Sequence, residues 1–132
     1  MTTNKSNWVV GAKAIHGNPF DGHTVDTALN QALKIIGKIP SNLFADKGYR
    51  GSDLGQHAVK LHISGTKRGK SHATLKKLKR RSAVEPIIGH MKFSNRLDRN
   101  FLKGIHGDKT NAVLAGCGRN IKKIIYCLKN QF

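Results

Sequence analysis

Acidic residues are scarce in this sequence. Its 132 residues include 7 Asp and Glu against 24 Lys and Arg, which gives a formal net charge of +17 at pH 7 and an isoelectric point near 10.4. A surface with so few carboxylates attracts polyanions through counterion release and long-range steering. We therefore expect nucleic acid as the partner, with anionic lipid as the rival.

Long hydrophobic runs and linkers are also missing. No apolar stretch approaches the roughly 18 residues that a membrane span needs, and no signal peptide opens the chain. We therefore expect a soluble cytoplasmic protein with no membrane partner. The hydrophobic content of 38% fits one domain over residues 1–132, since globular domains commonly contain about 50 to 200 residues.

Only two cysteines occur, Cys117 and Cys127. In one helix their backbones would be roughly 15 Å apart at a rise of about 1.5 Å per residue, too far for a disulfide. Neither lies in a CxxC or Cys/His ligand spacing, so the pattern does not favour zinc. We expect two small thiols buried in the core.

The first half of the chain has the pattern of an α/β domain. A strand is expected at residues 8–15, covered on both faces because it is almost continuously apolar. A helix is expected at 24–36, capped by Thr24 and Gly37. Further elements follow at 43–45 (a strand parallel to the first), from Ser52 (a short helix) and at 61–63 (a third strand).

The chain becomes strongly basic after Gly65. Twelve of the 24 Lys and Arg fall between Gly65 and Lys103. Much of this stretch should be helical, with a kink or restart near Ser82, because Pro86 lacks a backbone donor and costs about 3 kcal/mol inside a helix. From Asp108 an amphipathic helix is expected. Its apolar stripe would consist of Leu114, Cys117, Ile121, Ile124, Ile125 and Leu128.

Two carboxylates are candidates for chemistry. Asp46 follows a predicted parallel strand, where open α/β sheets place their ligands, so it is either a metal ligand or the cap of the next turn. Glu85, the only Glu, is spaced for one helical face with Arg81 and Lys92, so it is either a ligand or part of a surface ion pair. Carboxylate oxygens suit Mg²⁺. Two-metal phosphoryl transfer, however, usually needs more carboxylates than two, and no remaining Asp obviously completes the set.

Other polar and aromatic residues have two interpretations each. The segment from His16 to Thr24 holds His16, Asn18, Asp21 and His23, which fits a metal loop less well than a loop of Asn-Pro and Asp-Gly turns. Trp8 is expected in the core, while Tyr49 is left open between core packing and base stacking. The basic run from Lys76 to Arg81 favours phosphate contact over a merely solvated face.

Three segments of the chain resemble the DDE transposases of bacterial insertion sequences, in particular the insertion-sequence-five family. They are GAKAIHGNPFDGHT at 11–24, ADKGYRG at 45–51 and RRSAVEPIIGHMK at 80–92, which continues through NRLDRNFLKGIHGDKTNAVLAGCGRN. The family's A-D-x-G-Y motif assigns the second catalytic Asp to Asp46. Its Y-x2-R-x3-E-x6-K signature is matched by Arg81, Glu85 and Lys92, with Leu78 at the tyrosine position.

The resemblance implies an RNase H-like fold and metal-dependent DNA strand cleavage and transfer. In such a site three carboxylates hold two Mg²⁺ (or Mn²⁺) ions, and Asp46 and Glu85 would be two of them. Arg81 and Lys92 would hold the DNA backbone near the scissile phosphate. The other expected DNA contacts are Tyr49, Arg50, Lys76, Lys77, Lys79 and Arg80.

The resemblance also leaves the upstream part of the family's domain unmatched. The first catalytic Asp of the family lies on a strand before the GAKA segment. We therefore expect a partial RNase H-like fold, of parallel strands with flanking helices and a basic helical C-terminal region, whose central N-terminal strand is missing and whose sheet edge is unprotected. Such a fragment would hold Mg²⁺ poorly and would not cut DNA alone.

The partners that the resemblance implies are the DNA ends of an insertion sequence and either a full-length transposase or further copies of this chain. A non-catalytic basic DNA-binding protein is the alternative function. An RNA-binding protein of ribosomal type would fit the charge and size, but it leaves the two motif spacings unexplained.

Overall fold

Short helices and strands alternate in the first half of the chain, and the second half is helical. The computed structural model describes residues 1–3, 6–17, 19–65, 69 and 71–131, without the side chains of Arg80 and Arg81. The elements in chain order are η1 (Asp21–Thr24), α1 (Val25–Ile36), β1 (Asn42–Ala45), η2 (Lys47–Tyr49), β2 (Lys60–Ile63), α2 (His72–Arg80), η3 (Arg81–Ala83), α3 (Val84–Asn95) and α4 (Gly104–Lys129).

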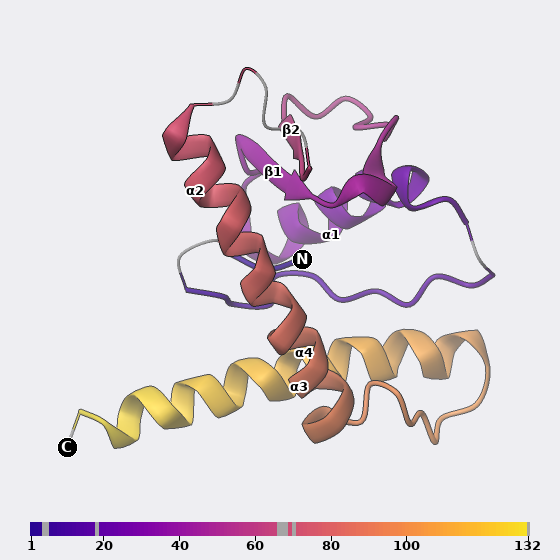
Figure 1. Cartoon of the computed structure of the whole chain (residues 1–132). Helices are drawn as coiled ribbons and strands as arrows, with labels where there is room; N and C mark the ends of the chain where they lie inside the picture. Colours follow the sequence, from indigo (N-terminus) through magenta and orange to yellow (C-terminus); the bar gives the residue numbers. More distant parts are fainter. Residues whose placement is uncertain (4–5, 18, 66–68, 70, 132) are drawn as a thin grey trace.

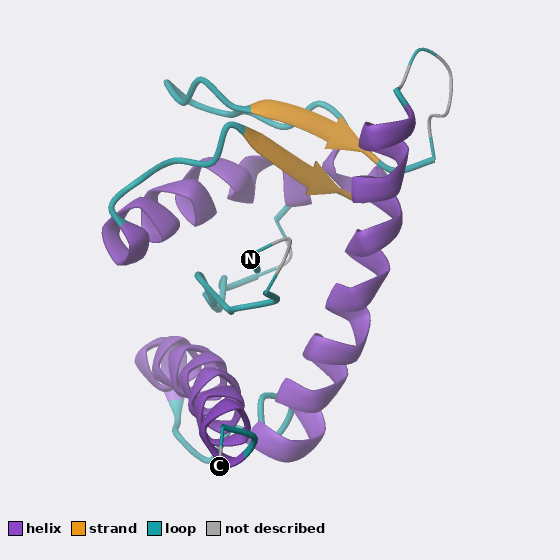
Figure 2. Cartoon of the chain, turned by 90° about the vertical axis from the view of Figure 1, so that its left-hand side faces the viewer, coloured by secondary structure: helices purple, strands orange, loops and turns teal. Residues whose placement is uncertain are grey.

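The elements form two layers joined by a column of helix. One layer contains the two strands with α1 beneath them, and α4 runs along the opposite side of the molecule (Figure 1). Between the layers, α2, η3 and α3 follow one another from the level of the sheet to the level of α4 (Figure 2). The mixed helix and strand content and the helical C-terminal region confirm the coarse prediction.

Helix α1 forms where its apolar spacing predicts. Leu29 and Ala32 are completely buried on one face, so this face anchors the helix. Gly37 ends the helix in the left-handed conformation, at φ 71°, and its N–H donates to the Leu33 carbonyl. The predicted Thr24 cap is wrong in detail, because the Thr24 hydroxyl donates to the Asp21 carbonyl at 2.7 Å.

The sheet of the described residues consists of β1 and β2 in parallel, with Asn42 opposite Lys60 and Ala45 opposite Ile63. The rings of Phe44 and His62 stack between the strands with centroids 4.7 Å apart. Beneath the sheet a core cluster of Val25, Leu29 and Val59 is joined by Leu43 and Tyr49, among others. The strands predicted at 43–45 and 61–63 are therefore confirmed, and they pair with each other.

The strand predicted at residues 8–15 is wrong. In the described part of this segment the ladder is limited to one isolated antiparallel bridge between Thr2 and Val9. Side chains take over backbone hydrogen bonds: Asn120 accepts from the N–H and donates to the carbonyl of Val9, and Gln31 donates to the Ala12 carbonyl. The segment is thus held between α1 and α4 without becoming part of the sheet.

The short helix predicted from Ser52 is also wrong. The Asp53 carboxylate accepts the Gly55 N–H at 2.8 Å, and Gly55 adopts a positive φ of 58°. This side-chain turn competes with helix formation for the same backbone donors. In contrast, the restart predicted near Ser82 is confirmed, because η3 interrupts the helix and Pro86 then falls in the first turn of α3.

Helix α4 buries a different face from the predicted one. Its buried residues are small: Gly107, Ala112, Ala115 and Gly116. A Cβ at Gly116 would lie 3.1 Å from Val9 Cγ1 and 3.3 Å from Ala12 Cβ, so the small face lets residues 9–12 approach closely.

The predicted apolar stripe of α4 faces outward instead. Leu114, Ile121 and Leu128 are 52–58% exposed, and Cys117 and Cys127 are exposed too, so the prediction of buried core thiols is wrong. Periodicity located the stripe, but it could not show that a second, smaller face packs better. No helix among the described residues has the length and apolar character to cross a membrane.

Candidate functional site

Asp46 stands directly after β1, at the carboxyl end of a parallel strand. Its backbone is extended, with φ −84° and ψ −174°, and the chain then turns sharply into η2. The Tyr49 N–H donates to the Asp46 carbonyl at 3.3 Å, which closes this turn. The side chain of Asp46 is exposed. Asp46 therefore occupies the position that sequence reasoning assigned to a ligand at a strand end.

A second carboxylate, Asp21, lies beside Asp46 across Gly48. A Cβ built at Gly48 would be 2.8 Å from Asp21 Oδ2 and 3.4 Å from Asp46 Oδ1. A side chain at position 48 would therefore collide with the Asp21 carboxylate and would lie in van der Waals contact with that of Asp46. The contact between η1 and η2 brings together two residues that are far apart in sequence. The glycine of the K-G-Y turn leaves room for the carboxylate pair.

The carboxylates of Asp21 and Asp46 affect the pKa of the nearby Tyr49 phenol. Burial raises the pKa of the Tyr49 phenol, and the negative charges of Asp21 and Asp46 raise it further, whereas a hydrogen bond with Thr24 lowers it. Both carboxylates are close enough to disfavour the phenolate. The ring also packs against the α1 core cluster. Core packing of Tyr49 is thus observed, and base stacking by its partly exposed ring stays a prediction.

Glu85 lies in the first turn of α3 and is exposed. Lys92 follows two turns later on the same helix and is also exposed. Arg81 belongs to η3, and its side chain lies outside the described structure. Within the described ranges, no group of three His, Cys, Asp or Glu side chains is arranged to hold a metal ion. Asp21 and Asp46 are therefore not joined by Glu85 in such a group.

The predicted basic contacts lie largely on helix α2. Lys76, Lys77 and Lys79 are exposed, while Leu75 and Leu78 on the same helix are half-buried. The helix thus turns its lysines to solvent. Arg50, after η2, is exposed as well. The side chain of Arg80 and the whole of Asn18 lie outside the described residues.

Trp8, expected in the core, is half-buried and already has a cationic neighbour. The Lys123 ammonium lies 4.8 Å from the centroid of its ring, and the same ammonium donates to the Ser6 carbonyl. This cation–π contact ties residues 6–8 to helix α4. The role of Trp8 is therefore structural.

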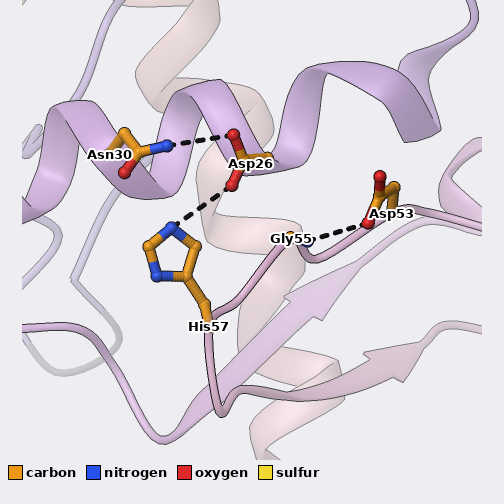
Figure 3. Close-up of polar contacts among 5 residues, drawn as sticks. All are labelled: Asp26, Asn30, Asp53, Gly55 and His57. Atoms are coloured by element: carbon orange, nitrogen blue, oxygen red, sulfur yellow. Dashed lines mark hydrogen bonds and ion pairs between the residues drawn. The ribbon is translucent and has the colours of Figure 1, made fainter.

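A separate polar pocket lies between α1 and the loop that precedes β2. Its volume is about 510 Å³, and it is lined by His23, Asp26, Asn30, Asp53, Gly55, Gln56 and His57. Figure 3 shows His57 and Asn30 each facing one oxygen of the Asp26 carboxylate. Nε2 of the imidazole lies 3.3 Å from Oδ1, and Nδ2 of the amide donates to Oδ2 at 3.0 Å.

Sequence reasoning missed both this pocket and the pairing of Asp21 with Asp46. Each group combines two chain segments that are more than twenty residues apart, so no local spacing points to it. The run Asp21-Gly22-His23 was the available signal for Asp21, and a turn accounts for it equally well.

Comparison of the chain with protein-family models, with curated proteins and with solved structures gives no match.

Proposed function

We propose that this chain is the C-terminal part of a DDE-type transposase of an insertion sequence, that it binds DNA, and that it does not cut DNA alone. The observation that carries the proposal is the exposed Asp46 carboxylate at the carboxyl end of β1, with Asp21 beside it across Gly48. This is the position of a ligand site in an open α/β sheet, and it is also the position that the A-D-x-G-Y motif assigns to a catalytic Asp.

The donor chemistry of the pair fits Mg²⁺ or Mn²⁺ in part. Both are hard cations that prefer carboxylate oxygens. Asp46 and Asp21 would supply two such ligands. The R-x3-E-x6-K motif assigns a third to Glu85, which the described structure does not bring into one group with them. When bound, such ions activate an attacking water or hydroxyl and stabilise the leaving oxygen. The protein's own contribution would be to hold the ligands and to orient the DNA.

The distribution of cations supports the DNA-binding part of the proposal. Lys76, Lys77 and Lys79 lie exposed on one helix, and Lys92 is exposed on the next. Lysines that face solvent can neutralise phosphates and release counterions, which is the main source of sequence-independent affinity for DNA. The alternative function, a non-catalytic DNA-binding protein, relies on the same observation.

Nicking of a supercoiled plasmid tests the proposal. Purified protein would be incubated with Mg²⁺ or Mn²⁺ and, in parallel, with EDTA, and the Asp46→Asn and Glu85→Gln variants would be treated alike. We expect no nicking, together with duplex binding that weakens steeply as salt rises. Metal-dependent nicking that both variants lose would contradict the claim of inactivity. Absence of salt-sensitive duplex binding would overturn the proposal as a whole.

Metal binding separates the transposase fragment from the alternative. The electron paramagnetic resonance signal of free Mn²⁺ decreases when the ion is bound, so a titration measures occupancy without any need for activity. We expect weak binding that Asp46→Asn and Asp21→Asn each reduce, with Asp53→Asn as the control from the separate pocket. Equal Mn²⁺ binding by all four proteins would favour the non-catalytic DNA-binding protein.

A further inference from the structure

The end of α3 and the turn that follows it each expose an aromatic ring. Phe93, on the last turns of α3, is 92% exposed, and Phe101, in the turn, is 75% exposed. An aromatic side chain gains stability mainly by burial, so exposed rings are costly for folding and solubility. Together with Lys92, Arg96, Arg99 and Lys103 these rings form what we call the aromatic-basic turn.

The turn is fixed to the body of the protein. The Asn111 amide donates to the carbonyls of Arg96 and Leu97 at 3.2 and 3.5 Å. Leu97 packs into the core cluster of α3 and α4. The backbone next to the rings is therefore anchored to the rest of the protein, and the rings are exposed even so.

Contacts at the start of α4 hold the second half of the turn. The Asn100 side chain donates to Asp108 at 2.6 Å and accepts from the Leu102 N–H at 2.9 Å. At Gly107 the fit is close, since a Cβ there would lie 2.6 Å from the carbonyl carbon of Leu102. Phe101 thus stands between two anchored residues and still points its ring to solvent.

The chain segment that carries the rings is rich in cations. The Arg96 guanidinium carbon lies 5.6 Å from the centroid of the Phe101 ring, which is a cation–π contact. Lys92, Arg96, Arg99 and Lys103 are all exposed, and they outnumber the two acids of this region, Asp98 and the Asp108 that accepts from Asn100. An apolar protein partner would have to bury these charges, whereas a polyanion would neutralise them.

We propose that the aromatic-basic turn binds single-stranded DNA by stacking unpaired bases on Phe93 and Phe101. The four cations would hold the phosphates on either side of the stacked bases, as in proteins that combine aromatic platforms with a basic surface. A paired base is already stacked in its duplex and cannot offer its face to the rings. The inference rests on the proposed DNA-binding function and adds a strand preference to it.

The test compares single-stranded and duplex DNA. An oligo-dT of about 15 nucleotides, within the site size of single-strand binding proteins, and a duplex of equal length would be titrated by fluorescence anisotropy. The Phe93→Leu/Phe101→Leu protein keeps apolar bulk at both positions but removes the rings. We expect its affinity for the single strand to fall by about tenfold or more, since base stacking is sequence-tolerant but needs an aromatic face. Its duplex affinity should change by less than about twofold.

Two further variants sharpen the result. Phe20→Leu removes a half-exposed ring outside the basic region and should leave both affinities unchanged. Arg96→Gln should lower the salt dependence of binding, by about one unit of the log–log slope, whereas the double Leu variant should leave the slope intact.

The outcomes separate the two proposals. Single-strand affinity that the double Leu variant retains, while wild type binds duplex in a salt-dependent way, would overturn the stacking site and leave the proposed function standing. An equal loss for single-stranded and duplex DNA would overturn it as well. Failure of wild type to bind either DNA would remove the proposed function itself.

Discussion

Residues 1–65 and residues 66–132 differ in net charge, and helix α1 of the first region differs from helix α4 of the second in the burial of its large apolar side chains. The first region has seven Lys and Arg against four Asp, while the second has seventeen against three acids. Both carboxylate groups described above, Asp21 with Asp46 and Asp26 with Asp53, belong to the first region. Most of the acids thus lie in the first region, and most of the cations lie in the second.

The packing contrast is equally clear. In the first region, α1 hides Leu29 completely. In the second, α4 packs through Ala112, Ala115 and Gly116 and leaves its larger apolar residues outside. Hydrophobic periodicity alone treats these two helices alike, so the difference lies in their partners. The buried face of α1 packs against side chains of β1 and the surrounding loops, such as Leu43 and Val59. Helix α4 packs against α3 and against residues 9–12, which approach its small residues closely.

The largest expected change in the free energy of unfolding comes from a variant that tests the difference in packing between α1 and α4. Leu29→Ala is expected to lower the free energy of unfolding by about 2–5 kcal/mol, because it leaves a cavity in an enclosed core. Ile121→Ala, at a position that is 55% exposed, should cost less than about 1 kcal/mol. Urea unfolding followed by circular dichroism measures both. Similar losses for the two variants would mean that the α4 stripe is buried in solution.

The charge contrast can be tested with two matched triple variants. Replacing Lys76, Lys77 and Lys79 with Gln should weaken duplex binding roughly tenfold or more at low salt and reduce the salt slope by about three. Replacing Lys34, Lys38 and Lys60, which are exposed in the first region, removes the same charge. This control should change the affinity much less. Equal effects would show that only the total charge matters.

Two helical glycines sharpen the account of α4. A Cβ at Gly107 would meet the Leu102 backbone, whereas a Cβ at Gly89 has nothing within 4 Å. Gly107→Ala should therefore destabilise the protein by about 1–3 kcal/mol through overpacking. Gly89→Ala should stabilise it by up to about 1 kcal/mol, because alanine is the better helix former. Thermal unfolding distinguishes the two signs, and a stabilising Gly107→Ala would argue against the anchored turn.

The smallest expected effect concerns the Asp21–Asp46 pair. In a Tyr126→Phe background Tyr49 is the remaining tyrosine, and phenolate absorbance reports its titration. Because burial and the two carboxylates raise the Tyr49 pKa above 10.0, Asp21→Asn and Asp46→Asn should each lower it. Asp53→Asn should leave it unchanged. An unaffected titration in both pair variants would show that the carboxylates are not beside the ring.

The same shift fixes the direction of a pH effect on stability. A folded pKa above the unfolded value means that the native state holds its proton more tightly. The contribution of Tyr49 is therefore complete below the unfolded pKa near 10.0 and is lost as pH rises through the folded pKa. Replacing Tyr49 with Phe should remove this loss at high pH.

Local chemistry made part of the fold predictable. Gly37 ends α1 and Pro86 fixes the start of α3, since each acts on its own backbone. The strand expected at 8–15 failed for a non-local reason: the hydrogen bonds it would have given a neighbouring strand go to Gln31 and Asn120. A local apolar pattern does not show which distant segment will pair with a strand.

The candidate site, too, has residues that local sequence could predict and residues that depend on contacts between distant segments. Motif spacing predicted Asp46 and Glu85 as ligands, and the strand that precedes Asp46 is confirmed. The neighbour of Asp46 could not be identified, because the contact of Asp21 depends on how η1 meets η2 and on the absence of a side chain at Gly48. The exposed face of α4 escaped prediction for a related reason, since amphipathic spacing does not say which face finds a partner.

Amide chemical-shift mapping with a short duplex of random sequence tests the central claim most directly. We predict perturbations concentrated on α2, α3 and the turn before α4, where the exposed Lys and Arg gather, with small changes in α1, β1 and β2. The perturbations should collapse toward the free positions as salt is raised, because the contacts are to phosphates. Perturbations centred on α1 and the sheet, or no perturbation at low salt, would contradict the proposal that the basic helical region binds DNA.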